Sequence, residues 1–263
     1  IDRMAPLAAW LSSYIKGADR DAARSAARLS KADLTTGMVG EFPELQGVMG
    51  AYYAAHDGED GAVAQAISEH YSPLGPNDDC PSAPLSVAVA LADKIDALVG
   101  FWRIDEKPTG SKDPFALRRA ALGVVRLLVE NDIRVPLINA FREAEILYGG
   151  ESDISADLLG FMADRMKVTL KARGLRHDWI AAVFESGSSM DDDLVRVTKR
   201  VEALRDFVGT DSGADLLAGY RRAANILRAE AKKAKGGLEL GSVDAGLFEE
   251  SAEKALHAAL AGS

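Results

Sequence analysis

Apolar residues recur at helical spacing along most of the chain. Leu7, Leu11 and Ile15 lie four residues apart and predict one apolar helix face near the start. The segment 84–101 is the most apolar of all, so we expect it to form the central helix of the core. Alternating β-branched stretches, which are typical of strands, are nearly absent. The pattern therefore predicts an all-α protein.

Breaks in this pattern separate the predicted helices. Pro73, Pro76 and Pro81 predict an irregular loop over 72–83, because proline removes backbone donors. Asp113 followed by Pro114 is a favourable helix start, with Asp113 as the N-cap. We expect helices over residues 7–15, 19–34, 46–55, 63–71, 84–101, 113–130, 136–148, 154–173, 177–185, 191–208, 211–235 and 243–260. The most plausible boundary is near residue 150, with a second hinge near Gly187.

Composition makes the chain acidic overall, but the charge is unevenly spread. The 263 residues include 48% hydrophobic and 27% charged residues, which is typical of a soluble globular protein. The net charge of −9 argues against indiscriminate nucleic-acid binding, whereas residues 165–235 alone are net basic. A basic segment inside an acidic chain points to a polyanionic partner. The alternative is that these cations only solvate helix faces.

Several classes of protein are excluded by what the sequence lacks. There is no run of 18 apolar residues that would predict a membrane-spanning helix. One cysteine, Cys80, cannot form an internal disulfide, which favours a reducing, cytoplasmic location. Phosphate-binding glycine loops, a G-x-S-x-G elbow and an H-E-x-x-H motif are all absent. We therefore predict no catalytic residue in this chain.

A weak metal-binding pattern involves His56 and the adjacent Asp57. A histidine beside an aspartate can bridge metal ions, and Asp33 and Asp93 would add carboxylates. Asp93 is conspicuous because it lies within the most apolar helix, where an unpaired carboxylate is costly. The alternatives are that Asp93 pairs with Lys94, caps a loop amide or points to solvent.

Cationic side chains suggest contacts with phosphates at three places. A flexible basic loop with Lys107 and Lys112 leads into a helix start that carries Arg118 and Arg119. Further along, helical spacing puts Arg196, Lys199 and Arg200 on one face, and Arg221 and Arg222 lie on the next helix. The alternative is that these arginines and lysines form salt bridges or a solvated face.

Three long strings resemble the bacterial glycine–tRNA ligase β subunit. Residues 30–59 read SKADLTTGMVGEFPELQGVMGAYYAAHDGE, residues 92–96 read ADKID, and residues 112–123 read KDPFALRRAALG. The resemblance covers essentially the whole chain and implies a middle-to-late part of that subunit. It implies an HD-like helical domain over 1–150, a helical connector over 151–188 and a partial anticodon-binding helical domain over 189–263.

The resemblance also implies a function. In this family the α subunit holds the site that activates glycine with ATP and Mg, and the β subunit supplies tRNA recognition. We therefore expect the α subunit and tRNA(Gly) as partners, no membrane or DNA partner, and no cofactor in this chain. The implied tRNA-binding residues are Lys107, Lys112, Arg118, Arg119, Arg196, Lys199, Arg200, Arg221 and Arg222.

The HD-type fold is named for a metal-binding set of the order His, His-Asp, Asp, and this sequence departs from it. Lys31-Ala32-Asp33 stands where the His-Asp pair is expected, and His56 resembles only a later, auxiliary histidine. The resemblance thus implies a vestigial site without metal, made of Lys31, Asp33, His56, Asp57 and Asp93, in which Lys31 replaces the metal charge. There are two alternatives. One is an active HD-type phosphohydrolase built on Asp33, His56, Asp57 and Asp93. The other is a purely structural role in holding subunits together.

Overall fold

The computed structural model describes residues 1–150, 152–186, 190–233 and 243–261. The chain divides into two compact units, residues 1–206 and 207–263. Within the described residues we find helices, one isolated bridge between Thr109 and Lys112, and no strand, which confirms the all-α prediction. None of these helices is both long and apolar enough to cross a membrane.

The first unit is built from eleven α-helices in its described part. They are α1 (Met4–Leu11), α2 (Arg20–Leu29), α3 (Gly37–Glu41), α4 (Val48–His56), α5 (Gly61–Glu69), α6 (Pro84–Arg103), α7 (Leu117–Glu130), α8 (Leu137–Leu147), α9 (Ser155–Ala172), α10 (His177–Glu185) and α11 (Leu194–Val208). Short 3-10 turns cover Ser12–Tyr14, Ala32–Thr35 and Pro43–Leu45. The segment 37–45, predicted only as a break, thus contains α3 and one of these turns.

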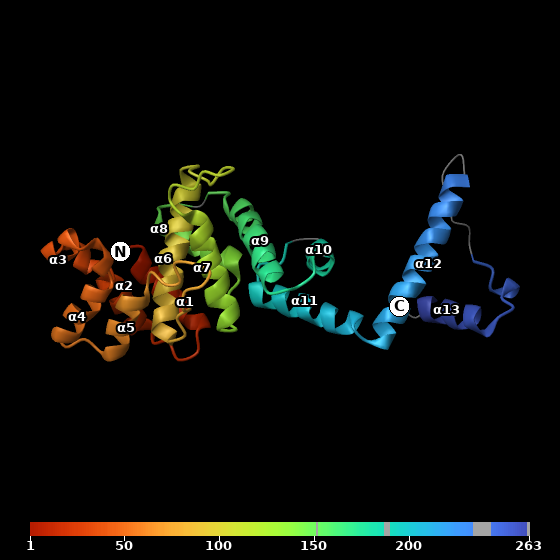
Figure 1. The fold of residues 1–263 in the computed structure, drawn as a ribbon, viewed down its shortest axis with the longest axis horizontal. Coiled ribbons are helices and arrows are strands. Elements are labelled where there is room, and N and C mark those ends of the chain that lie inside the picture. The colour runs from red at the N-terminus through yellow and green to blue at the C-terminus, as the bar shows by residue number, and fades with distance from the viewer. Residues whose placement is uncertain (151, 187–189, 234–242, 262–263) are drawn as a thin grey trace. The chain divides into compact units, whose positions relative to one another are not determined.

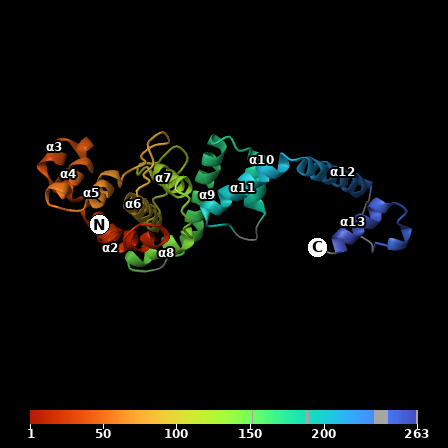
Figure 2. The ribbon, with the colours of Figure 1, turned by 90° about the horizontal axis from the view of Figure 1, so that it is seen from below.

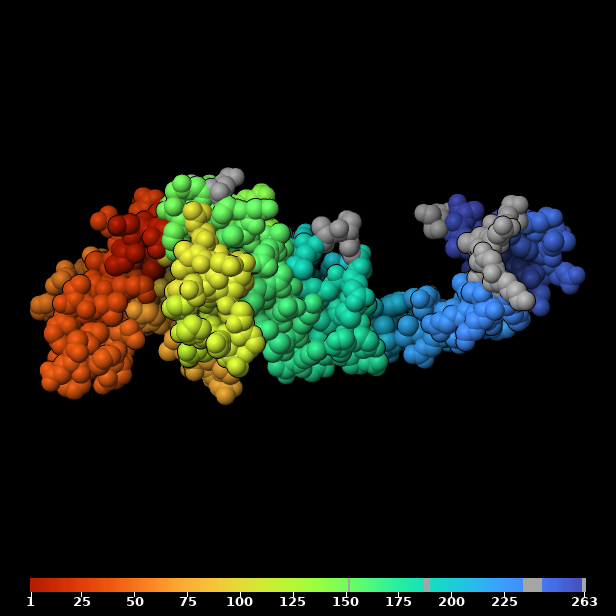
Figure 3. Space-filling view, turned by 90° about the horizontal axis from the view of Figure 1, so that it is seen from above, coloured from red at the N-terminus to blue at the C-terminus, as the bar shows by residue number. Residues whose placement is uncertain are grey.

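Helix α6 is the central element, as its apolar sequence predicts. It packs against α1, α2, α5, α7, α8 and α9 (Figure 1). Leu91, Ile95 and Leu98 are completely buried, and burial of each such side chain stabilises the fold by about 1.5–3 kcal/mol. In the space-filling view the segments coloured red to green adjoin one another (Figure 3).

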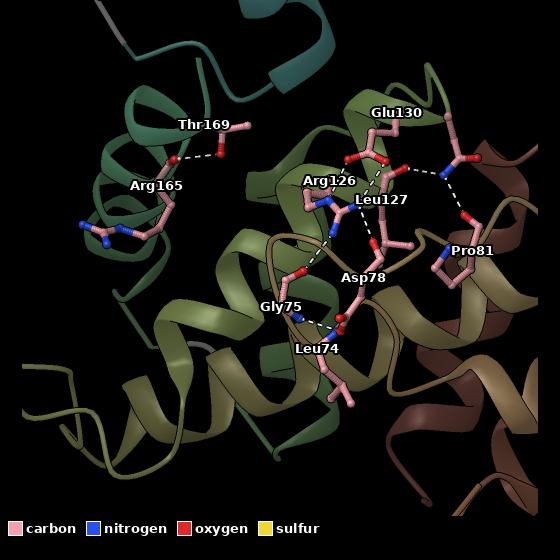
Figure 4. Close-up of polar contacts among 10 residues, drawn as sticks. Leu74, Gly75, Asp78, Pro81, Arg126, Leu127, Glu130, Arg165 and Thr169 are labelled. Carbon is pink, nitrogen blue, oxygen red and sulfur yellow. Dashed lines mark hydrogen bonds and ion pairs between the residues drawn. The ribbon is translucent and has the colours of Figure 1, made fainter. Parts of the chain in front are cut away.

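The loop before α6 is irregular, as predicted, and Arg126 of α7 holds it in place (Figure 4). The guanidinium of Arg126 donates to the carbonyls of Gly75 and Asp78, both at 2.8 Å, and pairs with Glu130 at 2.7 Å. Asp78 in turn accepts from the backbone amides of Leu74 and Gly75. Asn131 at the end of α7 also donates to the Pro81 carbonyl at 3.0 Å, so the proline-rich loop is fixed against α7 by these two side chains.

Helix α7 begins later than predicted. The first helical residue is Leu117, and Ala116 before it has a left-handed conformation. Asp113 still serves as the cap, because its carboxylate accepts from the amides of Leu117 and Arg118 at 2.8 and 3.0 Å. The Asp113 carboxylate thus caps amides of the helix as a cap residue does, but the N-cap position is occupied by Ala116, so the predicted start at residue 113 is wrong by one helical turn.

In the second unit the structure describes α12 (Asp211–Lys233), a 3-10 turn (Ala245–Leu247) and α13 (Ser251–Ala261). The single helix predicted over 243–260 is therefore wrong, because Asp244 caps a separate turn before α13 begins. The predicted end of the helix over 211–235 and the predicted hinge near Gly187 lie outside the described residues. The proposed three-part division by function stays a prediction, and the compact units meet at a different place, after Asp206.

Candidate functional site

A cluster of ionisable side chains lies where three elements of the first unit meet. Lys31, just after α2, places its ammonium 2.8 Å from the carboxylate of Asp93 on α6. The same ammonium is 3.4 Å from Nε2 of His70, which follows α5, and 4.2 Å from the ring centroid of Tyr71. The Lys31 and Asp93 side chains are only 23% and 20% exposed. One lysine therefore makes an ion pair, a histidine contact and a cation–π contact at a single point.

Asp33 lies near this cluster and has a different task. Its side chain is almost completely buried, and its Oδ2 accepts from the backbone amides of Gly47 and Gly50 at 2.6 and 3.0 Å. These amides belong to the start of α4, whose orphan donors need acceptors. Gly50 is required here, since a Cβ on it would lie 2.9 Å from the Ile67 side chain and 3.1 Å from Asp33 Oδ2. Asp33 thus anchors α4 through Oδ2, while its buried Oδ1 has no hydrogen-bond partner among the described residues.

Burial changes the protonation of two members of the cluster. Burial and, to a smaller extent, the neighbouring Lys31 charge lower the pKa of His70 to about 4. The neutral imidazole fits its contacts, because Nδ1 donates to the Ile67 carbonyl at 2.7 Å and Nε2 faces the Lys31 ammonium. Burial also lowers the pKa of Lys94 to about 8. The cluster therefore holds a neutral histidine between cationic lysines.

The predicted metal-site residues do not fit a metal ion. His56 and Asp57 are exposed at the end of α4, away from the buried cluster. Asp33 Oδ2 already accepts hydrogen bonds from two backbone amides, and the Lys31 ammonium pairs with Asp93. Throughout the described part of the chain, no three His, Cys, Asp or Glu side chains are arranged to hold a metal. The ionic partner of Asp93 is Lys31, whereas Lys94 donates to the Tyr71 carbonyl at 2.9 Å.

The loop that leads to α7 contains both paired and unpaired cations. Lys107 forms ion pairs with Asp105 and Asp157, each at 3.0 Å. Arg118 donates to the Gly110 carbonyl at 2.7 Å and so ties the loop to the helix. The ammonium of Lys112 and the guanidinium of Arg119 have no ion pair or hydrogen bond with any described residue. Of the four predicted phosphate-binding residues here, two are therefore open.

Arg119 lies at a surface hollow that also borders the ionic cluster. The hollow has a volume of about 220 Å³, and its wall includes Tyr71, Asp93, Lys94 and Phe115. Phe115 is 45% exposed and stacks on Phe101 with ring centroids 4.0 Å apart. Asp93 and Arg119 belong to two separate predictions from the sequence, and the structure places both residues at one hollow.

The predicted basic face on α11 is neutralised within the chain. Asp191 accepts two hydrogen bonds from Arg196 at 2.7 and 2.8 Å and lies 3.6 Å from Arg200. Lys199 pairs with Asp132 at 2.6 Å. On α12, by contrast, Arg221 and Arg222 are exposed and make no ion pair with a described residue. The alternative that these cations form salt bridges thus holds for α11, whereas on α12 Arg221 and Arg222 have no ionic partner among the described residues.

Sequence reasoning missed His70, which is fully buried beside Lys31. The available signal was its place at the end of an apolar helical stripe, since a histidine there must be buried neutral or paired. Spacing alone gave no reason to join it to residues 31 and 93, because the contact depends on how α2, α5 and α6 pack.

Comparison with known proteins identifies the family. The family model described as Glycyl-tRNA synthetase beta subunit matches residues 1–185. Proteins named Glycine--tRNA ligase beta subunit from Rhodospirillum centenum and Ruegeria sp. are 57% and 53% identical, over 90% and 100% of this chain. A third, from Paracoccus denitrificans, is 52% identical over 99% of the chain. The chain spans only 33–37% of the length of these relatives. Because the family model matches more than half of the chain, this chain belongs to the glycyl-tRNA synthetase beta subunit family.

Proposed function

We propose that this chain is a tRNA-handling part of a glycine–tRNA ligase β subunit, which together with an α subunit attaches glycine to tRNA(Gly) using ATP. The names of the relatives support the ligase activity and a second kind of subunit. The ATP, Mg and glycine site belongs on the α subunit in this proposal, and the location is the cytoplasm. No cofactor, membrane or DNA partner is assigned to this chain.

The observation that carries the proposal is the open guanidinium of Arg119. It lies at the hollow beside Phe115 and Lys94, with no carboxylate of the described chain to neutralise it. A guanidinium binds phosphate oxygens as a two-donor fork, and an exposed aromatic ring beside it can stack on an unpaired base. This combination fits an RNA backbone better than it fits a solvated surface.

The other predicted contacts divide into two groups. Lys112, Arg221 and Arg222 have free cationic groups and are assigned direct contacts with RNA phosphates. The remaining cations already have partners within the chain, so an RNA contact would have to replace an existing bond. We assign Arg118 and Lys107 to positioning the loop, and expect smaller direct contributions from Arg196, Lys199 and Arg200.

The ionic cluster is assigned a structural role in this proposal. Lys31 supplies the positive charge next to Asp93, and Asp33 supplies the acceptor that fixes α4. Asp93 lines the hollow but is paired with Lys31, and Asp33 is buried, so no observation favours the alternative of an HD-type phosphohydrolase.

Replacing Arg119 by alanine in the complete β subunit, assayed with its α subunit, is expected to lower kcat/KM for tRNA charging by about tenfold. That is the effect of losing one charge-assisted contact to a phosphate. The rate of ATP–glycine exchange without tRNA should not change, because Arg119 is assigned to RNA alone.

Arg142→Ala is the matched control, since Arg142 is also exposed and lies on α8 away from the hollow. The control should charge tRNA at the wild-type rate. If Arg119→Ala charges tRNA at the wild-type rate, the contact assigned to Arg119 is wrong, and if Arg118→Ala and Arg200→Ala do so as well, none of the arginine contacts tested is supported.

A further inference from the structure

The N-terminal hundred residues are net acidic, yet they contain one open basic surface. This part holds fourteen acidic and seven basic residues. Four of the seven basic residues, Lys16, Arg20, Arg24 and Arg28, occur at every fourth position. The net charge of a long segment does not reveal this spacing, because the surrounding acidic residues outnumber the four basic residues.

The three other basic residues in this part are already used inside the protein. Arg3 pairs with Asp96 at 2.8 Å, Lys31 pairs with Asp93, and Lys94 is buried and donates to a carbonyl. Residues 1–100 are all described, and within them the open cations are therefore the four at positions 16, 20, 24 and 28.

Helix α2 presents three of them as a stripe, Arg20, Arg24 and Arg28, which we call the α2 stripe. All three are exposed, and none makes an ion pair or hydrogen bond with a described residue. The neighbouring face of α2 consists of Ala23, Ala26 and Ala27, which are completely buried. That face packs against α1, α5 and α6, so the helix cannot turn its arginines inward (Figures 1 and 2).

The nearby carboxylates do not neutralise the stripe. Asp19 is the N-cap of α2, and its carboxylate accepts from the amides of Asp21 and Ala22 at 3.0 and 2.8 Å. Asp21 makes no ion pair with the stripe. On α11, by comparison, carboxylates neutralise the cations at 196, 199 and 200. In a chain with an excess of acid, α2 thus differs in keeping its arginines free.

We infer that the α2 stripe binds the phosphate backbone of RNA. Its residues are about 6 Å apart along the helix axis, so three guanidinium groups form a row about 12 Å long on a rigid support. A linear row of forked donors fits a repeating phosphodiester backbone better than it fits a single small anion. The inference rests on the proposed function, because it takes tRNA as the RNA, and it adds a contact surface to the one at Arg119.

The test is a binding titration of the full chain with glycine tRNA over a series of salt concentrations. The variant Arg20→Gln/Arg24→Gln/Arg28→Gln removes the stripe while glutamine keeps good helix propensity. If each arginine touches one phosphate, the slope of log K against log salt becomes shallower by about 2–3, and binding weakens at least about tenfold at low salt.

The control variant is Arg142→Gln/Lys171→Gln/Arg173→Gln, which removes the same charge from exposed positions that make no ion pair with a described residue and do not form one row. It should bind nearly as the wild type does. Thermal unfolding of both variants establishes that they are folded. A stripe variant that keeps the slope and affinity of the control overturns the inference while the proposed function stands. A wild-type chain that does not bind tRNA overturns both.

Discussion

Replacing Asp33 by alanine is expected to destabilise the first unit by about 3–5 kcal/mol. The change removes the acceptor of two buried backbone amides, those of Gly47 and Gly50, and both amides would be left without a partner. Hydrogen bonds to a buried charged group are among the strongest in a protein, and an unpaired buried donor carries its full desolvation cost. Urea unfolding followed by circular dichroism measures the change.

Asp57→Ala is the control for this measurement. Both aspartates belong to the set predicted from the sequence, but Asp57 is exposed and its side chain has no partner among the described residues. We expect its replacement to change the unfolding free energy by no more than about 0.5 kcal/mol. Equal effects of the two substitutions would contradict the anchoring role of Asp33.

Acidification is expected to destabilise the first unit through His70. The folded protein holds this histidine neutral with a pKa of about 4, whereas the unfolded chain has the ordinary value near 6.5. Between these pH values the unfolded chain binds the proton and the folded protein does not, so stability falls as the pH falls. The loss begins below about pH 6.5, is complete near pH 4, and amounts to roughly 3 kcal/mol.

The unfolding free energy measured between pH 6.5 and 5 tests this expectation, because most carboxylates stay ionised there. His70→Gln should flatten the pH dependence in this interval. His56→Gln, at an exposed position, should leave it unchanged. A slope that persists in the His70 variant would mean that another group accounts for the pH dependence.

The sequence predicted the helices well where one face is strongly apolar. The run 84–101 became the central helix α6 because almost every face of it has a neighbour to pack against. Asp113 was identified correctly as a cap, but its carboxylate reaches amides a turn further on, so the start of α7 was misplaced. Spacing shows which residue can cap a helix, and loop geometry decides which amides it reaches.

The candidate site could be predicted only in part. Lys31 and Asp93 were both singled out, and the structure brings them together, whereas His56 and Asp57 lie on the exposed end of α4. His70 takes a place in the cluster because α5 ends against α2 and α6, which is a property of the packing and not of the sequence pattern.

Residue type did not separate open cations from paired ones. Arg196 and Arg119 look alike in the sequence, yet one forms two hydrogen bonds with Asp191 and the other has no described partner. The acid that neutralises Arg196 is five residues away in the chain and could have been noticed. The partner of Lys199 is Asp132, which belongs to a distant segment and becomes apparent only in the folded structure.

The most direct test of the central claim, that this chain handles tRNA, is a titration of the unaltered chain with glycine tRNA and with one unrelated tRNA across a salt series. We predict tighter binding to glycine tRNA, with log K falling linearly as log salt rises, because phosphate contacts release counterions. The absence of salt-dependent binding to both tRNAs would contradict the claim, whereas equal affinity for the two would mean that the chain binds tRNA without selecting glycine tRNA.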